Sequence, residues 1–194
     1  MPVVHSFSRL AQRTLLITLL VFQPINVAAL SIEGVQFQES VSIDHKQIPI
    51  RGVALLRWLK FFKVYVAALY LPENGSPNDV LADIPKRLEL SYLVSISGPD
   101  FGKGAEAILE RNHSQNELAR LRSRIDQLNA VYRDVKPGDR YALTYVPGKG
   151  TELSYNGSAL ITIPGPDFAA AYFGIWLGKD PIDLKMRSRL INGG

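Results

Sequence analysis

The chain has no cysteine, and only three histidines, two tryptophans and two methionines among its 194 residues. Without cysteine it can form no disulfide bond, thiol nucleophile or lipidated N-terminal cysteine. The histidines, His5, His45 and His113, stand apart from one another, and isolated histidines are seldom metal ligands. The sequence also lacks the G-x-S-x-G and H-E-x-x-H motifs. We therefore expect neither a bound metal nor a cofactor.

The N-terminal residues 1–29 have the pattern of a secretory signal peptide. Arg9 and Arg13 precede a short apolar core, Leu15–Phe22, and small residues follow up to Ala29. A transmembrane anchor is the alternative, but a membrane span needs about 20 apolar residues and this core is shorter. We expect cleavage after Ala29 and export of the remaining chain, to the periplasm if the source is a Gram-negative bacterium.

Residues 30–194 are then expected to form one domain, long enough to bury a substantial core. The leader carries two arginines and no acidic residue, so its removal lowers the formal net charge from +4 to +2. Such a small net charge argues against nucleic acid as a partner. No later stretch is apolar and long enough to be an integral membrane span.

Hydrophobic periodicity predicts groups of strands separated by helices, which is typical of an α+β fold. The capping-box residues Ser114 and Glu117 open one helix, and Asp167 is expected to cap another. Asn156-Gly157 predicts a type I′ hairpin turn. Strands are expected over 31–44, 46–59, 61–71, 86–96, 140–146, 151–155 and 158–163, and helices over 76–84, 101–112, 114–132, 168–178 and 181–190.

The segment FFKVYVAALYLP, residues 61–72, reads as a strand that is buried on both faces but contains polar groups. Alternation along a strand places Lys63 and Tyr65 on the same face. We expect this face to look toward the helices, with Ala67 and Ala68 leaving space beside it.

Three segments together resemble the chalcone isomerase-like family, and in particular its bacterial exported branch. They are GVALLRWLKFFKVYVAALYLP (52–72), SYLVSISGPDF (91–101) and GIWLGKDPIDLKMRSRLI (174–191). The resemblance covers most of residues 31–192. It implies an open-faced β-sandwich, in which a large antiparallel sheet has helices on one face and a ligand cleft lies between them.

Enzymes of this family close a chalcone into a flavanone without a cofactor, by orienting the substrate's own phenolate. The resemblance implies an arginine that steers this phenolate, and a strand threonine and a helix tyrosine that hold a water molecule. Relatives without this activity bind fatty acids in the same cleft, with the arginine on the carboxylate. Arg57 falls at the arginine position, Tyr65 at the threonine position and Phe101 at the tyrosine position.

Phenylalanine has no hydroxyl group, so the catalytic pair of the enzymes is not present in its usual form. The resemblance therefore implies non-catalytic binding of a hydrophobic carboxylate or similar amphiphile, such as a fatty acid, at Arg57, Tyr65, Phe101 and Lys63. One alternative is a cofactor-independent isomerase, an intramolecular lyase acting on an enone or phenol, with Arg57 and Tyr65 as catalytic candidates. Another is an interaction module whose cleft is filled by its own side chains. The ligand, the pathway and the oligomeric state stay open.

Overall fold

A computed structural model describes residues 29–73, 76 and 79–193 of the chain. Its strands are β1 (Ala29–Ile32), β2 (Val35–Gln38), β3 (Ser40–Ile43), β4 (Lys46–Trp58), β5 (Phe62–Tyr70), β6 (Lys86–Tyr92), β7 (Arg140–Val146), β8 (Gly150–Tyr155) and β9 (Ser158–Ile163). Its helices are α1 (Gly98–Asn112), α2 (Gln115–Asn129), α3 (Pro166–Leu177) and α4 (Leu184–Asn192).

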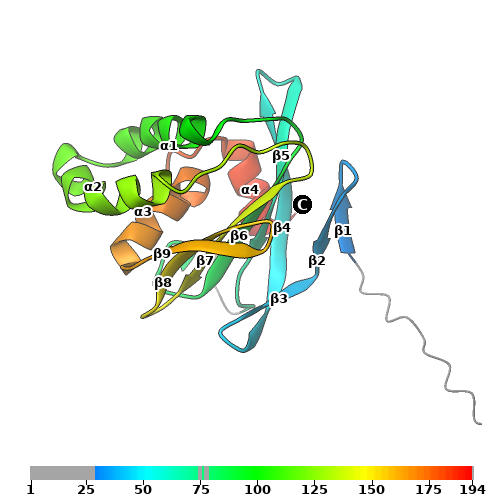
Figure 1. Cartoon of the computed structure of the whole chain (residues 1–194). Coiled ribbons are helices and arrows are strands. Elements are labelled where there is room, and N and C mark those ends of the chain that lie inside the picture. The colour runs from blue at the N-terminus through cyan, green and yellow to red at the C-terminus, as the bar shows by residue number, and fades with distance from the viewer. Residues whose placement is uncertain (1–28, 74–75, 77–78, 194) are drawn as a thin grey trace, which may run out of the picture.

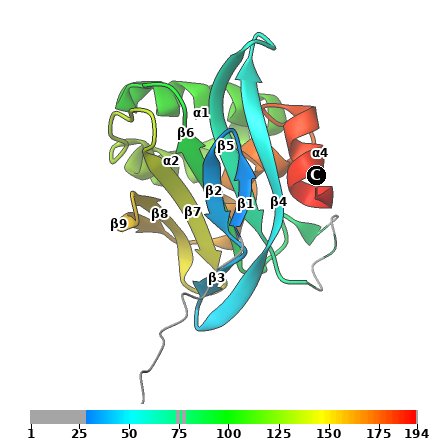
Figure 2. The same cartoon turned by 90° about the vertical axis from the view of Figure 1, so that its right-hand side faces the viewer.

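Strands β3 to β9 form one antiparallel sheet in which each strand pairs with its neighbours in the sequence. Figures 1 and 2 show the helices on one face of this curled sheet and the β1–β2 hairpin on the other. The predicted α+β class, with helices packed on one face of a large antiparallel sheet, is confirmed. None of the described helices is long and apolar enough to cross a membrane.

The strand expected over residues 31–44 is in fact three short strands. Glu33 and Gly34 take positive φ angles of 54° and 76°, and this turn folds β1 back onto β2. A second break at Glu39 separates β2 from β3, which enters the large sheet. Alternation alone did not reveal these breaks, because neither carries a strong turn dipeptide. The expected leader up to residue 28 and part of the expected helix over 76–84 lie outside the described residues.

Strand β5 runs through the centre of two hydrophobic cores. Tyr65, Ala67 and Leu69 belong to the large core that the helices complete. Val66 and Ala68 belong to a smaller core on the opposite face, under the β1–β2 hairpin. Successive strand side chains point to opposite faces, so one apolar run serves both layers. The expectation that the Tyr65 face looks toward the helices is confirmed, but Ala68 lies on the opposite face and neither Ala67 nor Ala68 lines a space beside Tyr65.

The predicted N-terminal cap is present at α2 but not at α3. The capping box is present at α2, where Ser114 accepts from the amide of Glu117. At α3 the N-cap is Gly165, whereas Asp167 lies in the first turn and does not cap the helix. The Asp167 carboxylate instead accepts two hydrogen bonds from Arg124 on α2, at 2.8 and 2.6 Å. A bidentate guanidinium pair is a stronger partner than a single cap hydrogen bond.

Lys86 is a fully buried lysine at the start of β6. Its ammonium group donates to the carbonyl of Ala82 at 2.6 Å and lies over the rings of Tyr145 and Phe173. Burial lowers the pKa of Lys86 to about 8, because the charged form loses water, and nearby Asp83 only partly opposes this.

The buried lysine predicts a pH dependence of folding stability. Between about pH 8 and 10 the folded lysine has lost its proton while the unfolded lysine keeps it, because the folded pKa is the lower one. The free energy of unfolding should therefore rise with pH across this range. Urea unfolding of the wild type and of Lys86→Met at several pH values measures this contribution, and the difference between the two proteins cancels the tyrosine ionisations.

Lys103→Met is the matched control, since the Lys103 side chain is 77% exposed. This variant should retain the rise, whereas Lys86→Met should lose it. Parallel stability profiles for the wild type and Lys86→Met would contradict the assignment.

Candidate functional site

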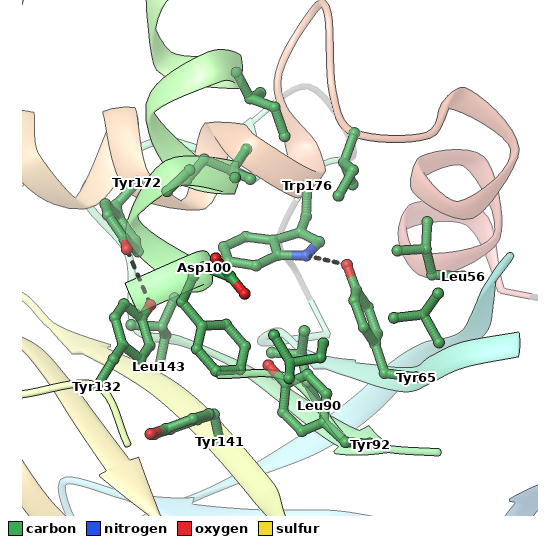
Figure 3. A pocket seen from close by; sticks show the side chains of 18 of the residues that line it. Leu56, Tyr65, Leu90, Tyr92, Asp100, Tyr132, Tyr141, Leu143, Tyr172 and Trp176 are labelled. Atoms are coloured by element: carbon green, nitrogen blue, oxygen red, sulfur yellow. Dashed lines mark hydrogen bonds between the residues drawn. The ribbon is translucent and has the colours of Figure 1, made fainter. Parts of the chain in front are cut away.

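A cavity of about 300 Å³ lies between the sheet and the helices. It is lined mainly by apolar and aromatic side chains from β4–β8, from α1 and α3 and from the loops around them. Figure 3 shows several of these side chains converging on the space. Its volume is at the lower end of the range of small-molecule sites.

The floor of the cavity is built from residues that pair across neighbouring strands. Leu56 of β4 is opposite Tyr65 of β5, which is in turn opposite Tyr92 of β6. Leu90 of β6 pairs with Tyr141 of β7 in the same way. Side chains that pair across strands point to the same face, so the sheet brings distant aromatic residues together.

The walls come from helical stripes with three- and four-residue spacing. Phe101, Gly104, Ala105 and Ile108 line the cavity from α1, and the spacing places them on one helix face. No atom lies within 4 Å of the point where a Cβ of Gly104 would stand, so this glycine leaves open space. On α3 the same spacing brings Tyr172, Ile175 and Trp176 to the opposite wall.

A β-bulge at Val64 decides which residues of β5 face the cavity. Leu56 pairs with Tyr65, but the next residue of β4, Arg57, pairs with Lys63, so Val64 is the extra residue on β5. Val64 and Tyr65 both line the cavity, as neighbouring residues of a bulge can. The bulge therefore breaks the simple alternation that placed Lys63 beside Tyr65.

The structure brings two of the four predicted site residues together and separates the other two from them. Tyr65 and Phe101 line the cavity, whereas Arg57 and Lys63 do not. Arg57 lies between the cavity-lining residues Leu56 and Trp58, and alternation turns it to the other face. The Glu33 carboxylate at the β1–β2 turn accepts from Arg57 at 3.5 Å and from Lys63 at 2.5 Å.

Four hydroxyl groups around the cavity already have partners within the protein. That of Tyr141 accepts from the Arg133 amide at 2.7 Å and donates to the Arg133 carbonyl at 3.1 Å. Tyr65 accepts a hydrogen bond from the indole of Trp176 at 2.9 Å, as Figure 3 shows. The hydroxyls of Tyr132 and Tyr172 are hydrogen-bonded to each other, also at 2.9 Å. These pairs connect the sheet, α3 and the end of α2 around the ligand space.

The Tyr92 hydroxyl is different, because it has no hydrogen-bond partner among the residues that the structure describes. Tyr92 is only 4% exposed, and its ring packs edge-on against Tyr65, Phe101 and Tyr141. Figure 3 places it between Tyr65 and Tyr141, within the ring of cavity residues. The Tyr92 oxygen is not among the fully buried polar atoms that lack a partner in the described part of the chain, so it is accessible from the cavity and can donate to a bound molecule.

The cavity contains no basic side chain among the described residues that line it, and Asp100 is its one charged residue. Hydrogen bonds from Lys103 and Ser97 lower the pKa of Asp100, so this carboxylate stays ionised. Burial raises the pKa of Tyr65 and of Tyr92 far above the usual value, and both phenols stay neutral. The site thus offers neutral hydrogen-bonding groups in an apolar environment.

The described residues contain no group of three or more acidic or histidine side chains placed to hold a metal ion. The aromatic donor set around the cavity is not one that coordinates Mg²⁺, Ca²⁺ or Zn²⁺, which take oxygen, imidazole or thiolate ligands.

Sequence reasoning missed several cavity residues that have recognisable signals. Tyr92 ends the alternating run of Leu88, Leu90 and Tyr92, so its face follows from the strand period. Trp176 lies four residues after Tyr172 on one helix face. The hydrogen bond between Trp176 and Tyr65 could not be foreseen, because 111 residues separate them.

Comparison with known proteins agrees with this architecture. A family model described as chalcone isomerase-like matches residues 29–192. A solved structure of a fatty-acid binding protein from Arabidopsis thaliana superimposes with a TM-score of 0.66 at 16% sequence identity, covering 85% of this chain and 96% of that one. At this identity the superposition shows a shared fold. No curated protein matches the chain in a sequence comparison. Because the family model covers most of its length, this chain belongs to the chalcone isomerase-like family.

Proposed function

We propose that this protein is a non-catalytic binding protein that holds one hydrophobic small molecule in the cavity between the sheet and the helices. The observation that carries this proposal is an apolar cavity of about 300 Å³ with a buried, unpartnered phenol, Tyr92, in its wall. The Arabidopsis protein of the same fold supports it, since the fatty acids that it binds are hydrophobic molecules.

The chemistry of the lining favours a ligand whose buried polar group is neutral. A carboxylate inside the cavity would lose its water without meeting a cation, because the one charged lining residue is Asp100, which is 53% exposed and carries a negative charge. A ketone, ether or hydroxyl oxygen can instead accept the proton of Tyr92. A fatty acid would bind with its chain inside and its carboxylate at the mouth, in water.

Two further features support binding over isomerisation. The residue at the position of the enzymes' helix tyrosine is Phe101, which stacks on Tyr132 with ring centroids 4.9 Å apart. The residue at the position of the strand threonine is Tyr65, whose oxygen already accepts from Trp176. Phe101 has no hydroxyl to hold a water molecule, and the Tyr65 hydroxyl, which keeps its own proton as a donor, is held by Trp176 rather than paired with a helix tyrosine.

We also propose that the protein is exported, on the strength of the leader pattern in residues 1–29. N-terminal sequencing of the protein recovered from cells that express the full chain measures this. The expected first residue is Leu30. A mature protein that still begins at Met1 would contradict export by cleavage.

Filling the cavity should abolish ligand binding without unfolding the protein. Ala105 is buried and lines the cavity from α1, so Ala105→Leu inserts three carbon atoms into the ligand space. The affinity for Nile red, an uncharged apolar fluorophore, should fall by about 5- to 150-fold, because overpacking costs about 1–3 kcal/mol. Fluorescence titration measures the affinity, and thermal unfolding checks the fold.

Ala107→Leu is the matched control, because it makes the same change two residues further along α1 at an exposed position. It should bind Nile red as the wild type does. Equal affinities for both variants and the wild type would place the probe elsewhere and contradict the proposal.

Removing the free hydroxyl should weaken the binding of a ligand with a neutral oxygen. Tyr92→Phe removes one hydrogen-bond donor, which is worth about 1 kcal/mol or a roughly fivefold loss of affinity. Displacement of Nile red by dodecanol and by dodecanoate compares two ligands with the same chain and different heads. We expect dodecanol to bind more tightly to the wild type and to lose the most in Tyr92→Phe.

Tyr70→Phe is the control for this variant, since Tyr70 lies in the core on the other face of the sheet and donates to Gln38.

Arg57→Gln tests the carboxylate anchor that the family resemblance implies. Its affinity for dodecanoate should be unchanged, because Arg57 does not line the cavity. A large loss of dodecanoate affinity in Arg57→Gln would show that Arg57 is the anion anchor after all.

A further inference from the structure

The turn between β4 and β5 carries the largest exposed apolar surface in the described part of the chain. We call residues 58–62, Trp58-Leu59-Lys60-Phe61-Phe62, the hairpin tip. Phe61 is 82% exposed, and Trp58, Leu59 and Phe62 are each 63–65% exposed. Only two other large apolar residues of the described part are exposed, Ile182 and Leu184. Such a concentration of exposed apolar side chains marks an interaction surface.

The hairpin tip stands clear of the rest of the molecule. Figures 1 and 2 both show the β4–β5 hairpin projecting beyond the helices. Leu59 and Lys60 make the turn with positive φ angles of 49° and 66°, where glycine or asparagine is usual. Leucine in this conformation is strained, so local stability does not explain its presence. An exposed apolar side chain at the extreme end of the hairpin is better explained by a partner.

The charges around the hairpin tip are mainly positive. Lys60 lies at its centre and has no ion pair among the described residues, while Arg57 and Lys63 flank it. Glu33 is the acidic residue that pairs with both flanking residues. Segments that lie in the headgroup region of a membrane are rich in tryptophan, phenylalanine and leucine with interspersed lysine, as the hairpin tip is. The positive charge favours anionic lipids.

The hairpin tip is also continuous with the cavity. Trp58 is exposed at the tip and lines the cavity at the same time, and Ile182, itself 39% exposed, lines it as well. A hydrophobic ligand partitions into a bilayer rather than into water, because its apolar surface leaves water there. If the hairpin tip binds a membrane, the cavity opening beside it lies where such a ligand is concentrated.

From these observations we infer that the hairpin tip docks on an anionic lipid surface and that the cavity exchanges its ligand with the bilayer there. The docking is inferred from the residues of the hairpin tip alone, whereas the ligand exchange rests on the proposed binding function. Phe61 and Phe62 insert between the lipid headgroups, Lys60 contacts lipid phosphates, and Trp58 connects the membrane to the cavity mouth.

Vesicle flotation tests the docking directly. The purified protein should float with vesicles of equal parts phosphatidylglycerol and phosphatidylcholine, and much less with phosphatidylcholine alone. The double variant Phe61→Ser/Phe62→Ser should bind at least about tenfold more weakly, because two phenyl groups no longer leave water. Both side chains are exposed, so the melting temperature should stay as in the wild type.

A matched pair of lysine variants tests the charge. Lys60→Gln should reduce binding to the anionic vesicles about fivefold, the usual effect of one lysine near such a surface. Lys149→Gln makes the same charge change beyond the other end of β4, where Lys149 pairs with Asp44, and should bind as the wild type does. If both variants lose the same amount of vesicle binding, the effect depends only on net charge. That result would contradict specific docking through the hairpin tip.

The two tryptophans allow an independent measurement. Trp176→Phe leaves Trp58 as the only tryptophan, and Trp58→Phe leaves Trp176 in the cavity wall. Brominated phosphatidylglycerol should strongly quench the fluorescence of the first variant and leave that of the second largely unchanged. Absence of quenching at Trp58 would contradict insertion of the tip.

The remaining outcomes separate the two proposals. A protein that binds Nile red in solution but no vesicles overturns the docking and leaves the binding function intact. A protein that binds vesicles but no probe overturns the binding function and leaves the docking intact. A dimer in sedimentation experiments without lipid that is lost in Phe61→Ser/Phe62→Ser would show that a second copy covers the tip, and would overturn the lipid proposal.

Discussion

The pairing of β5 with β4 on one side and β6 on the other is the constraint on which the rest of this structure depends. Because β5 is an interior strand that is buried on both faces from Tyr65 to Tyr70, its register decides which side chains meet the helices. The row Leu56, Tyr65 and Tyr92 across these strands forms the cavity floor. The bulge at Val64 then turns Lys63 away from this floor, and alternation along β4 turns Arg57 away. The two basic residues beside the aromatic cavity are thus kept out of it.

This separation determines the chemistry that the cavity can offer. An arginine brought into the apolar space would lose its hydration, and its partner Glu33 is on the other face of the sheet. The polar groups that line the space are mostly phenols, which burial keeps neutral. Tyr65, Tyr132 and Tyr172 are hydrogen-bonded to side chains and Tyr141 to the Arg133 backbone, whereas Tyr92 has no partner in the described part of the chain. This arrangement is the basis for proposing a ligand with a large apolar surface and a neutral oxygen.

The cavity and the hairpin tip share Trp58, so ligand binding and surface docking are structurally connected. The long strands β4 and β5 serve two purposes along their length. Their central parts complete the two cores, and their ends project beyond the helices and carry exposed aromatic residues. An isolated two-stranded ribbon is marginally stable on its own, so the cores below it hold the tip in place.

The amino-acid sequence was enough to predict the order of the main strands and helices, the capping box of α2, the hairpin turn at Asn156-Gly157 and the alternation that directs Tyr65 toward the helices. These features follow from local periodicity and turn chemistry. It also placed Phe101 on a helix facing the sheet. Three features emerge only in the folded chain. Val64 is bulged, Glu33 holds Arg57 and Lys63 outside the cavity, and Trp176 reaches Tyr65. Each of these depends on contacts between residues far apart in the chain, where the register of a strand or the spacing between layers settles which side chain finds which partner.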